Sequence, residues 1–204
     1  MAITARDFSK FDLLEHERVS ILEYDLSEIA GIPDLISTIG NIDVLINNAG
    51  MLYSLPYDAY PLEKIEYIIR LNIESPVALI RAVSKIMIQN GKGRIVNNAS
   101  IAGQIGHYDI WYGITKAGLI NVTKSFSRIL GPKGILINAV APGPVETNMI
   151  MPSDKWKSAF KKTVISGRLA SAQEVAETIG WLGTSSPEYF NGTCIDINNG
   201  SFSR

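Results

Sequence analysis

Residues 44–50, Val-Leu-Ile-Asn-Asn-Ala-Gly, pass from a short apolar run into a polar turn that ends in glycine. The same change recurs at residues 94–100, where Arg-Ile-Val-Asn leads into Asn-Ala-Ser. It recurs again at residues 135–143, where Ile-Leu-Ile-Asn-Ala-Val leads into Ala-Pro-Gly. Short apolar runs bounded by such turns are typical of buried parallel strands. The repeated pattern therefore predicts a parallel sheet whose strand ends carry small and polar residues.

Longer amphipathic stretches alternate with the strand-like runs along the whole chain. The predicted strands are Val19–Tyr24, Val44–Ile46, Arg94–Asn97, Ile135–Val140 and Cys194–Ile197. The predicted helices are Ser27–Ile39, Leu62–Gln89, Trp111–Leu130, Asp154–Val164 and Ala172–Leu182. Strands separated by helices indicate β-α-β units with helices on both faces of the sheet. We expect one doubly wound α/β domain over residues 1–204.

Bulk composition excludes several classes of protein. The 204 residues are 46% apolar and 19% charged, which suits one globular domain. A net charge of −1 gives no reason to expect nucleic acid or an anionic membrane as partner. No apolar run approaches the ~20 residues that span a bilayer. The single cysteine, Cys194, cannot form an intramolecular disulfide, so we expect a reducing, cytoplasmic location. No metal site is expected.

Tyr112-Gly-Ile-Thr-Lys116 places a phenol and an ammonium at positions i and i+4, on one face of a predicted helix. A phenol with a pKa near ~10 is a poor acid or base at neutral pH unless a nearby cation favours phenolate. Lys116 would supply that charge and lower the pKa of Tyr112. Ser100 ends the preceding strand, where its hydroxyl could hold a substrate carbonyl beside the phenol.

The spacing alone does not establish a catalytic pair, because Tyr60 and Lys64 repeat it. Pro61 and Glu63 indicate that this second pair begins a solvent-facing helix, and no serine-ended strand precedes it. We interpret Tyr60 and Lys64 as structural. Taken out of context, Tyr112 and Lys116 could equally be a plain exposed pair.

The ordered set of motifs resembles the short-chain dehydrogenase/reductase family. The motifs are Asn47-Asn-Ala-Gly50, Ser100, Tyr112-x-x-x-Lys116-Ala-Gly118, Asn138-Ala-Val-Ala-Pro-Gly143, Thr147 and the closing Phe190–Gly200. The resemblance runs from residue 1 to about residue 200. It implies a Rossmann-type doubly wound parallel sheet and an NADP(H)-dependent oxidoreductase that interconverts a ketone and a secondary alcohol.

The resemblance also assigns catalytic roles to four residues. Tyr112 would be the general acid/base, and Ser100 would hydrogen-bond the reacting oxygen. Lys116 would lower the pKa of Tyr112 and hold the nicotinamide ribose hydroxyls. Asn72 would anchor a water that leads to Lys116. An ordinary helical asparagine with a satisfied side chain remains the alternative for Asn72.

Three groups of residues would contact the cofactor according to the same resemblance. Asn48, Ala49 and Gly50 would brace the sheet and pass close to the cofactor. Pro142, Gly143, Val145 and Thr147 would hold the nicotinamide carboxamide. Asp25 and Leu26 would flank the adenine, although Asp25 could instead be an ordinary helix N-terminal residue.

Arg6 follows a stretch, Ile3-Thr-Ala, that resembles the end of the family's second strand. An arginine there can pair bidentately with a ribose 2′-phosphate, whereas an acidic residue near that site accepts from the 2′-hydroxyl of NAD. Arg6 therefore favours NADP over NAD. An exposed surface arginine is the alternative.

The chain departs from the family at its beginning. No G-x-x-x-G-x-G occurs, so the first strand, the glycine-rich turn that binds pyrophosphate and the first helix are absent. With the family's strand order of 3-2-1-4-5-6-7, the missing first strand would leave two inner edges unpaired. The sequence is either part of a longer protein or that of a damaged relative, and we favour the former. Residues 149–168 (Met149–Arg168), with Met151, Trp156 and Phe160, are expected to form an apolar substrate lid.

The leading hypothesis is NADP-linked reduction of a ketone, with 3-oxoacyl thioesters as the favoured substrate class. A non-catalytic scaffold or oligomerisation fragment is the alternative. The helices Trp111–Leu130 and Leu62–Gln89 commonly pair between subunits in the family, so we expect a homotetramer or homodimer.

Overall fold

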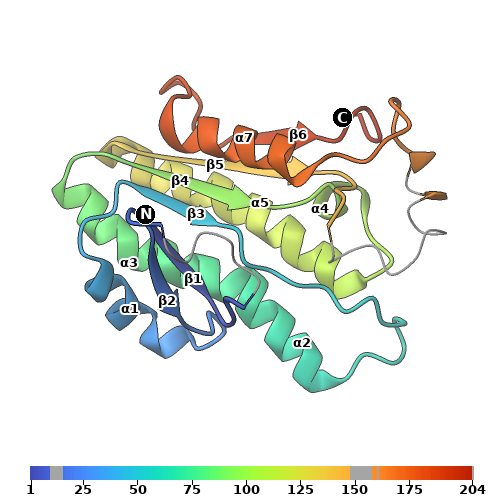
Figure 1. The fold of residues 1–204 in the computed structure, drawn as a ribbon, viewed down its shortest axis with the longest axis horizontal. Helices are drawn as coiled ribbons and strands as arrows, with labels where there is room; N and C mark the ends of the chain where they lie inside the picture. Colours follow the sequence, from blue (N-terminus) through green and yellow to red (C-terminus); the bar gives the residue numbers. More distant parts are fainter. Residues whose placement is uncertain (10–15, 148–157, 160, 204) are drawn as a thin grey trace.

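The computed structural model describes residues 1–9, 16–147, 158–159 and 161–203 (Figure 1). Its strands are β1 (Ala2–Ala5), β2 (Ser20–Glu23), β3 (Val44–Asn47), β4 (Gly93–Asn98), β5 (Ile135–Pro142) and β6 (Cys194–Ile197). Its helices are α1 (Ile32–Ile39), α2 (Leu62–Ile69), α3 (Ser75–Gln89), α4 (Ala102–Ile105), α5 (Ile110–Leu130) and α7 (Ala172–Thr184). Two 3₁₀ turns, η1 (Ile29–Gly31) and η3 (Gly131–Lys133), and a π-turn, η2 (Arg70–Glu74), complete the elements.

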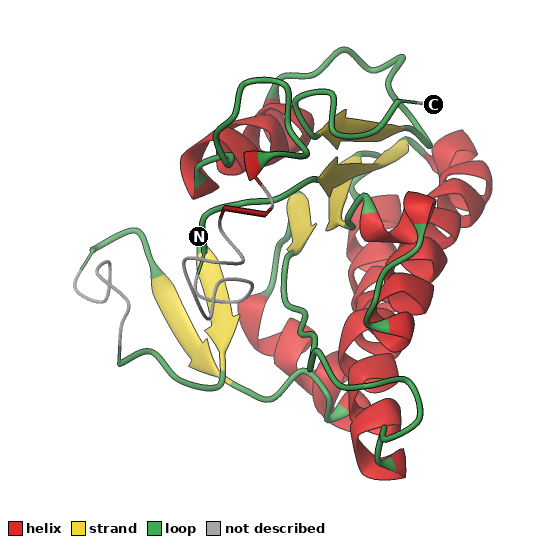
Figure 2. Cartoon of the chain, turned by 90° about the vertical axis from the view of Figure 1, so that its right-hand side faces the viewer, coloured by secondary structure: helices red, strands yellow, loops and turns green. Residues whose placement is uncertain are grey.

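All strand pairs are parallel, and they form two separate sheets. β1 pairs with β2, while the larger sheet has the order β3-β4-β5-β6, as Figure 2 shows. Within the described ranges, β1 and β3 each pair on one side only. Ile46 on β3 is consequently 45% exposed, whereas Ile137 on the central β5 is fully buried. The predicted parallel α/β fold is confirmed, with the sheet divided where the family's first strand is expected.

Helices cover both faces of the larger sheet because alternate residues of its central strands point in opposite directions. Ile95 and Ile137 are cross-strand neighbours, and they pack into a core cluster with residues of α1 and α3. Val96 and Val140 belong to the cluster that contacts α7 on the other face. In Figure 1, α7 lies on one side of β4 and β5, and α3 and α5 lie on the other. The sheet is thereby doubly wound, as the sequence predicted.

A chain of buried polar groups connects β3, β4 and α5. Asn47 and Asn97 face each other across the β3–β4 pair, and Asn47 Nδ2 donates to Asn97 Oδ1 at 2.8 Å. Asn97 Nδ2 donates in turn to Thr123 Oγ1 on α5 at 2.9 Å. All three side chains are at most 5% exposed. The central helix is thus hydrogen-bonded to the sheet as well as packed against it.

The single long helix predicted over Leu62–Gln89 is interrupted by the π-turn η2. The Ser75 N–H bonds to the carbonyl of Arg70, five residues back, and Pro76 has no N–H to offer to the turn before it. Of the predicted helix Asp154–Val164, residues 154–157 and 160 lie outside the described residues, whereas Ser158, Ala159 and Lys161 are helical and residues 162–164 are not. No helix in the described ranges has both the length and the apolarity of a bilayer-spanning segment.

Candidate active site

Tyr112 and Lys116 lie on successive turns at the beginning of α5, and their side chains are only 8% and 5% exposed. Lys116 Nζ lies 5.6 Å from the centre of the Tyr112 ring. The same nitrogen donates a 2.7 Å hydrogen bond to the backbone carbonyl of Asn98, the last residue of β4. Burial of an ammonium group is costly, and perturbed groups of this kind concentrate at functional sites. A plain exposed pair, which the spacing alone left open, is excluded for these two residues.

Burial shifts the pKa values of both groups. It lowers the pKa of the Lys116 ammonium to about 8, because the charged form loses hydration. It raises the pKa of the Tyr112 phenol, against the opposing effect of a hydrogen bond with Ser100 and with further upward contributions from Asp109 and Tyr108. Desolvation of the phenol therefore dominates the pKa of Tyr112 in this structure, and the lowering of that pKa by Lys116 stays a prediction. Tyr112 is a protonated phenol at neutral pH.

Ser100 lies beside Tyr112, as predicted. It follows β4, and its hydroxyl oxygen accepts a 3.1 Å hydrogen bond from the backbone N–H of Ala102 in α4. The hydroxyl also donates at 3.5 Å to the carbonyl of Pro142, at the end of β5. Because Ser100 is also close enough to Tyr112 to lower the pKa of its phenol, the ends of two neighbouring strands and the start of α5 converge near one hydroxyl.

Asn72 lies in the π-turn, is 1% exposed and is fully engaged by protein groups. Its Nδ2 donates to the Met51 carbonyl at 2.9 Å and to Thr115 Oγ1 at 3.0 Å, and its Oδ1 accepts from the Met51 N–H at 2.9 Å. A Cβ placed on Gly50 would lie 3.3 Å from Asn72 Oδ1 and 3.4 Å from Lys116 Nζ. Asn72, Gly50 and Lys116 therefore lie next to one another. The anchored water stays a prediction.

The turn after β3 presents its backbone at the surface beside this cluster. Asn48 and Ala49 are exposed and Gly50 is half-buried. Asn48 Oδ1 accepts a 2.7 Å hydrogen bond from Asn98 Nδ2, which ties the turn to the end of β4. Asn98 thus bonds to Asn48 through its side chain and to Lys116 through its carbonyl.

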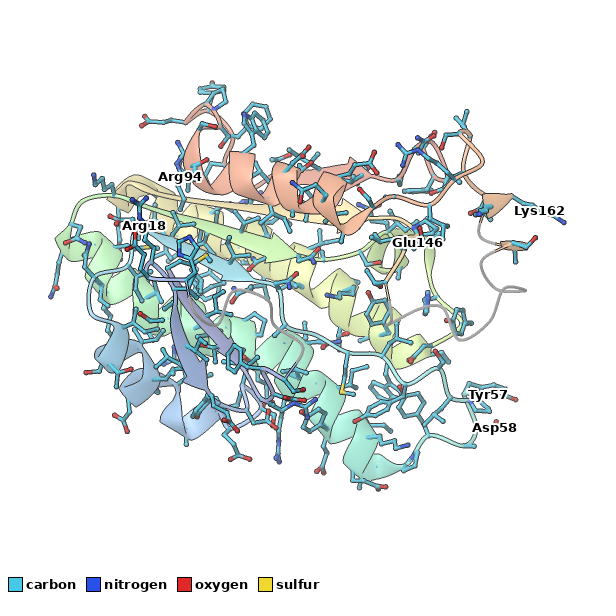
Figure 3. All side chains as sticks on the ribbon, in the orientation of Figure 1. Arg18, Tyr57, Asp58, Arg94, Glu146 and Lys162 are labelled. Atoms are coloured by element: carbon cyan, nitrogen blue, oxygen red, sulfur yellow. The ribbon has the colours of Figure 1, made fainter. Side chains whose placement is uncertain are left out.

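The segment after β5 is the second side of the candidate site. Gly143 donates its N–H to the Ile197 carbonyl at 2.9 Å, and Val145 forms a bridge with Ala170. Thr147 is half-buried and lies in a bend. In Figure 3, Glu146, between Val145 and Thr147 in the chain, lies toward the end of the molecule to which β4 points, whereas Arg94 lies at the opposite end. This arrangement places the segment at the carboxyl end of the sheet, where ligands bind in such folds.

Arg6 and Asp25 meet at the carboxyl end of the smaller sheet. Arg6 Nη1 donates to Tyr67 Oη at 2.7 Å and lies 3.8 Å from Asp25 Oδ2, and Tyr67 Oη donates to the same carboxylate at 3.3 Å. Burial would raise the pKa of Asp25, but hydrogen bonds from Ser27 and the charge of Arg6 outweigh it and lower that pKa. The Arg6 side chain remains 58% exposed. Leu26 packs against the core cluster of α1 and α3.

Tyr60 has a structural role, as predicted, but through a contact that the sequence did not predict. Helix α2 begins only at Leu62, so Tyr60 and Lys64 do not share a helical face. Tyr60 Oη donates to both carboxylate oxygens of Asp109 at 3.1 Å. Lys64 Nζ lies 5.0 Å from the centre of the Tyr53 ring.

Asp109 is the main residue of the site that sequence reasoning missed. It precedes α5 as its N-cap, accepts a hydrogen bond from the Tyr112 N–H and is fully buried. The available signal was its place three residues before Tyr112, where aspartate is a favoured helix cap.

Half of the lid predicted over residues 149–168 falls outside the described part, including Met149, Met151, Trp156 and Phe160. Its described end is anchored: Arg168 pairs bidentately with Glu174 of α7 at 2.8 and 2.6 Å. Among the described residues, no group of three His, Cys, Asp or Glu side chains could hold a metal ion.

Comparison with known sequences identifies relatives of this chain. A family model described as enoyl-(acyl carrier protein) reductase matches residues 14–201. The 3-oxoacyl-[acyl-carrier-protein] reductase FabG of Aquifex aeolicus is 34% identical over 171 residues, which cover 83% of this chain and 69% of the relative. FabG of Escherichia coli is 34% identical over 165 residues, covering 80% of this chain and 68% of the relative.

Solved structures of nicotinamide-cofactor complexes share the fold of this chain. The structure described as ElxO with NADP bound superposes with a TM-score of 0.91 at 28% identity, covering 100% of this chain and 88% of that one. A gluconate 5-dehydrogenase from Burkholderia cenocepacia in complex with NADP and tartrate gives a TM-score of 0.90 at 24% identity, covering 98% and 84%.

Proposed function

Because this chain belongs to the short-chain dehydrogenase/reductase family of oxidoreductases, we propose that it interconverts a ketone and a secondary alcohol by hydride transfer with NADP(H). One observation carries the proposal: Tyr112, Ser100 and Lys116 are gathered where β4, β5 and α5 converge, with Tyr112 and Lys116 buried.

Proton transfer in this reaction is assigned to Tyr112. In the direction of reduction, its phenol gives a proton to the oxygen of the former carbonyl group while Ser100 donates a hydrogen bond to the same oxygen. The raised pKa of Tyr112 keeps the phenol protonated at neutral pH, which favours its action as an acid. NADPH, when bound, supplies the hydride that adds to the carbonyl carbon.

We assign two roles to Lys116: it positions the cofactor, and its ammonium group supplies positive charge and can exchange a proton. Its ammonium is fixed by the Asn98 carbonyl and lies beside Gly50, and we assign it to hold the ribose hydroxyls of the cofactor. With a pKa of about 8, the group can also exchange a proton near neutral pH. Asn72 holds Met51 and the first turns of α5 together beside it.

Several observations support NADP as the cofactor. The Gly50 turn, exposed at Asn48 and Ala49, gives backbone access to a ligand beside Lys116. Arg6, at the carboxyl end of β1, retains an exposed guanidinium that can pair with a 2′-phosphate. ElxO, which superposes over all of this chain, is described with NADP bound. NAD is the less favoured cofactor.

For the substrate we propose a 3-oxoacyl thioester, on the basis of the FabG relatives. For the assembly we propose a homodimer or homotetramer formed through α5. Its outer face exposes Ile110, Ile114 and Ile129 at 46%, 52% and 58%, and an apolar helix face of this kind is typical of an interface. A cytoplasmic location stays a prediction.

NADPH titration and turnover together test the proposal. The protein encoded by the full gene is titrated with NADPH and with NADH by fluorescence, and NADPH oxidation is followed with a 3-oxoacyl thioester and with a panel of other ketones. Tighter binding of NADPH and turnover of the thioester support the proposal. Binding without turnover of any ketone, or no binding at all, contradicts it and favours the scaffold alternative.

A further inference from the structure

Asp109 is a buried carboxylate whose four hydrogen-bond donors come from two separate parts of the chain. From α5, the Tyr112 N–H donates to Oδ1 at 3.0 Å. From the loop over residues 53–60, the N–H groups of Tyr53 and Ser54 donate to Oδ2 at 3.0 and 2.9 Å, and Tyr60 Oη donates to both oxygens at 3.1 Å. The side chain is 0% exposed. A helix cap needs only the first of these bonds.

The loop adopts a conformation that these bonds stabilise. Ser54 has a positive φ of 56°, which non-glycine residues rarely adopt and which persists only when neighbouring contacts impose it. Both amide groups around this position donate to Asp109. Tyr53 and Tyr60 also contact each other edge-to-face, with ring centroids 6.2 Å apart. The carboxylate is therefore the common anchor of the loop.

The same loop packs against the Tyr112 side chain. Tyr112 forms a core cluster with Ile68 and Ala102, and the half-buried Met51, Leu52 and Tyr53 pack against that cluster. The opposite end of this segment is held at Met51 by Asn72. The segment that packs against the Tyr112 cluster is thus fixed at two points. Asn72 holds it at Met51, and Asp109 holds it at Tyr53 next to the start of α5.

We infer that Asp109 is a positioning residue: its carboxylate fastens the loop over residues 53–60 to the start of α5 and thereby fixes the Tyr112 phenol for proton transfer. This inference rests on the proposed function of Tyr112. Asp109 touches neither substrate nor cofactor in this account, and it acts through Tyr112 alone.

The charge of Asp109 gives the inference a measurable signature. The groups that face Tyr112 or border it are Lys116 on α5, His107, Tyr108 and Asp109 before α5, Ser100 after β4, and Tyr53 and Tyr60 in the loop. Asp109 contributes to the raised pKa of Tyr112, because its negative charge opposes formation of phenolate. Removal of that charge should lower the pKa of Tyr112. This shift reports the proximity of the Asp109 charge to Tyr112, and a fall in kcat at unchanged NADPH affinity reports the positioning.

The variants Asp109→Asn and Asp109→Ser separate the contributions of charge, cap and loop anchor. Serine keeps a good N-cap but is too short to hold the loop donors as well. We expect both variants to keep NADPH affinity within a few-fold while kcat falls by about 10–100-fold, the cost of a misplaced catalytic group. The basic limb of the kcat profile of Asp109→Asn should move to lower pH. The control Asp58→Asn, an exposed carboxylate of the same loop, should change neither quantity.

Loss of kcat together with the pH shift supports the inference, and an unmoved pH profile with kcat within threefold of wild type overturns it. If the Asp109 variants do not fold, Tyr60→Phe decides, because it removes one donor and leaves the charge. A kcat more than threefold lower at unchanged NADPH affinity supports the inference, and an unchanged kcat overturns it.

A titration that needs no turnover separates this inference from the proposed function. Phenolate absorbance is recorded against pH for the wild type and for Tyr112→Phe, and the difference reports Tyr112 alone. The same difference is recorded in the Asp109→Asn background. A lower Tyr112 pKa there supports the coupling to Asp109 even in a protein that reduces no ketone, and an identical pKa overturns it.

Discussion

The ammonium of Lys116 donates a 2.7 Å hydrogen bond to the backbone carbonyl of Asn98, so the buried cation of α5 is attached to the end of β4. The same residue Asn98 holds Asn48 through its side chain at 2.7 Å. Lys116 is thereby placed between Tyr112 and the exposed turn after β3. A flexible lysine side chain held in this way loses little further entropy when it binds a ligand.

Tyr112→Phe removes the phenol hydroxyl and keeps the ring that packs against Ile68 and Ala102. We expect turnover to fall by about 10²–10⁴-fold, because the variant lacks the hydroxyl that we assign to proton transfer. Steady-state kinetics with the best ketone of the panel measures the change. Tyr57→Phe, at a side chain 76% exposed, is the matched control and should retain wild-type turnover. Equal losses in both variants would rule out Tyr112 as the acid.

Lys116→Met should change how stability depends on pH. Burial lowers the folded-state pKa of Lys116 to about 8 from an ordinary value of 10.5, so above about pH 8 the unfolded chain binds a proton that the folded chain has released. The free energy of unfolding of the wild type should therefore rise with pH, relative to that of Lys116→Met, from about pH 8 toward 10.5. Denaturant unfolding of both proteins at several pH values measures this difference. Parallel curves would show that Lys116 is not desolvated.

Arg6→Gln should weaken NADPH binding selectively. Glutamine can still bond to Tyr67 but carries no charge for a 2′-phosphate. We expect a loss of about 1.5–3 kcal/mol for NADPH, roughly 10–100-fold in Kd, and little change for NADH. Arg18→Gln, at a side chain 84% exposed, serves as the control in the same fluorescence titrations. A similar loss for both cofactors would place Arg6 away from the phosphate.

Gly50→Ala tests the close approach between the turn after β3 and the catalytic residues. The added methyl group would lie 3.3 Å from Asn72 Oδ1, a tight contact that requires the Asn72 amide to give by a few tenths of an ångström, and 3.4 Å from Lys116 Nζ. We expect turnover to fall by about tenfold or more, since small displacements of catalytic groups are costly. Gly180→Ala, with no atom within 4 Å of the new methyl group, should leave turnover unchanged. Wild-type kinetics in Gly50→Ala would mean that the turn is remote from the reaction.

Most of the fold followed from the alternation of apolar runs and amphipathic stretches. β6 has the predicted bounds, and α5 begins one residue earlier than predicted. The interruption of the long helix at Asn72 was not predicted, because hydrophobic periodicity passes smoothly through a π-turn. Pro76 was the local sign of it.

Only the residues of the candidate site that belong to a recognisable sequence motif could be predicted. Ser100, Tyr112, Lys116 and Asn72 meet as expected, because strand ends and helix starts gather at one edge of a parallel sheet. Asp109 was missed because its partners Tyr53, Ser54 and Tyr60 lie about 50 residues away in the chain, in a loop without periodicity. The direction of the Tyr112 pKa shift was missed for a similar reason, since spacing reveals a nearby charge but not the extent of burial.

The buried hydrogen bonds from Asn47 through Asn97 to Thr123 also constrain how the chain can assemble. If β3 slid by one residue along β4, Asn47 would face an aliphatic or solvent-side neighbour, and two interior amides would lose their partners. Each orphaned group would cost about 1–3 kcal/mol. Burial of apolar side chains already opposes such a slip, and the Asn47–Asn97 hydrogen bond adds a polar penalty to it. The hydrogen bond favours the observed β3–β4 register, in which the turn at Gly50 lies next to Lys116.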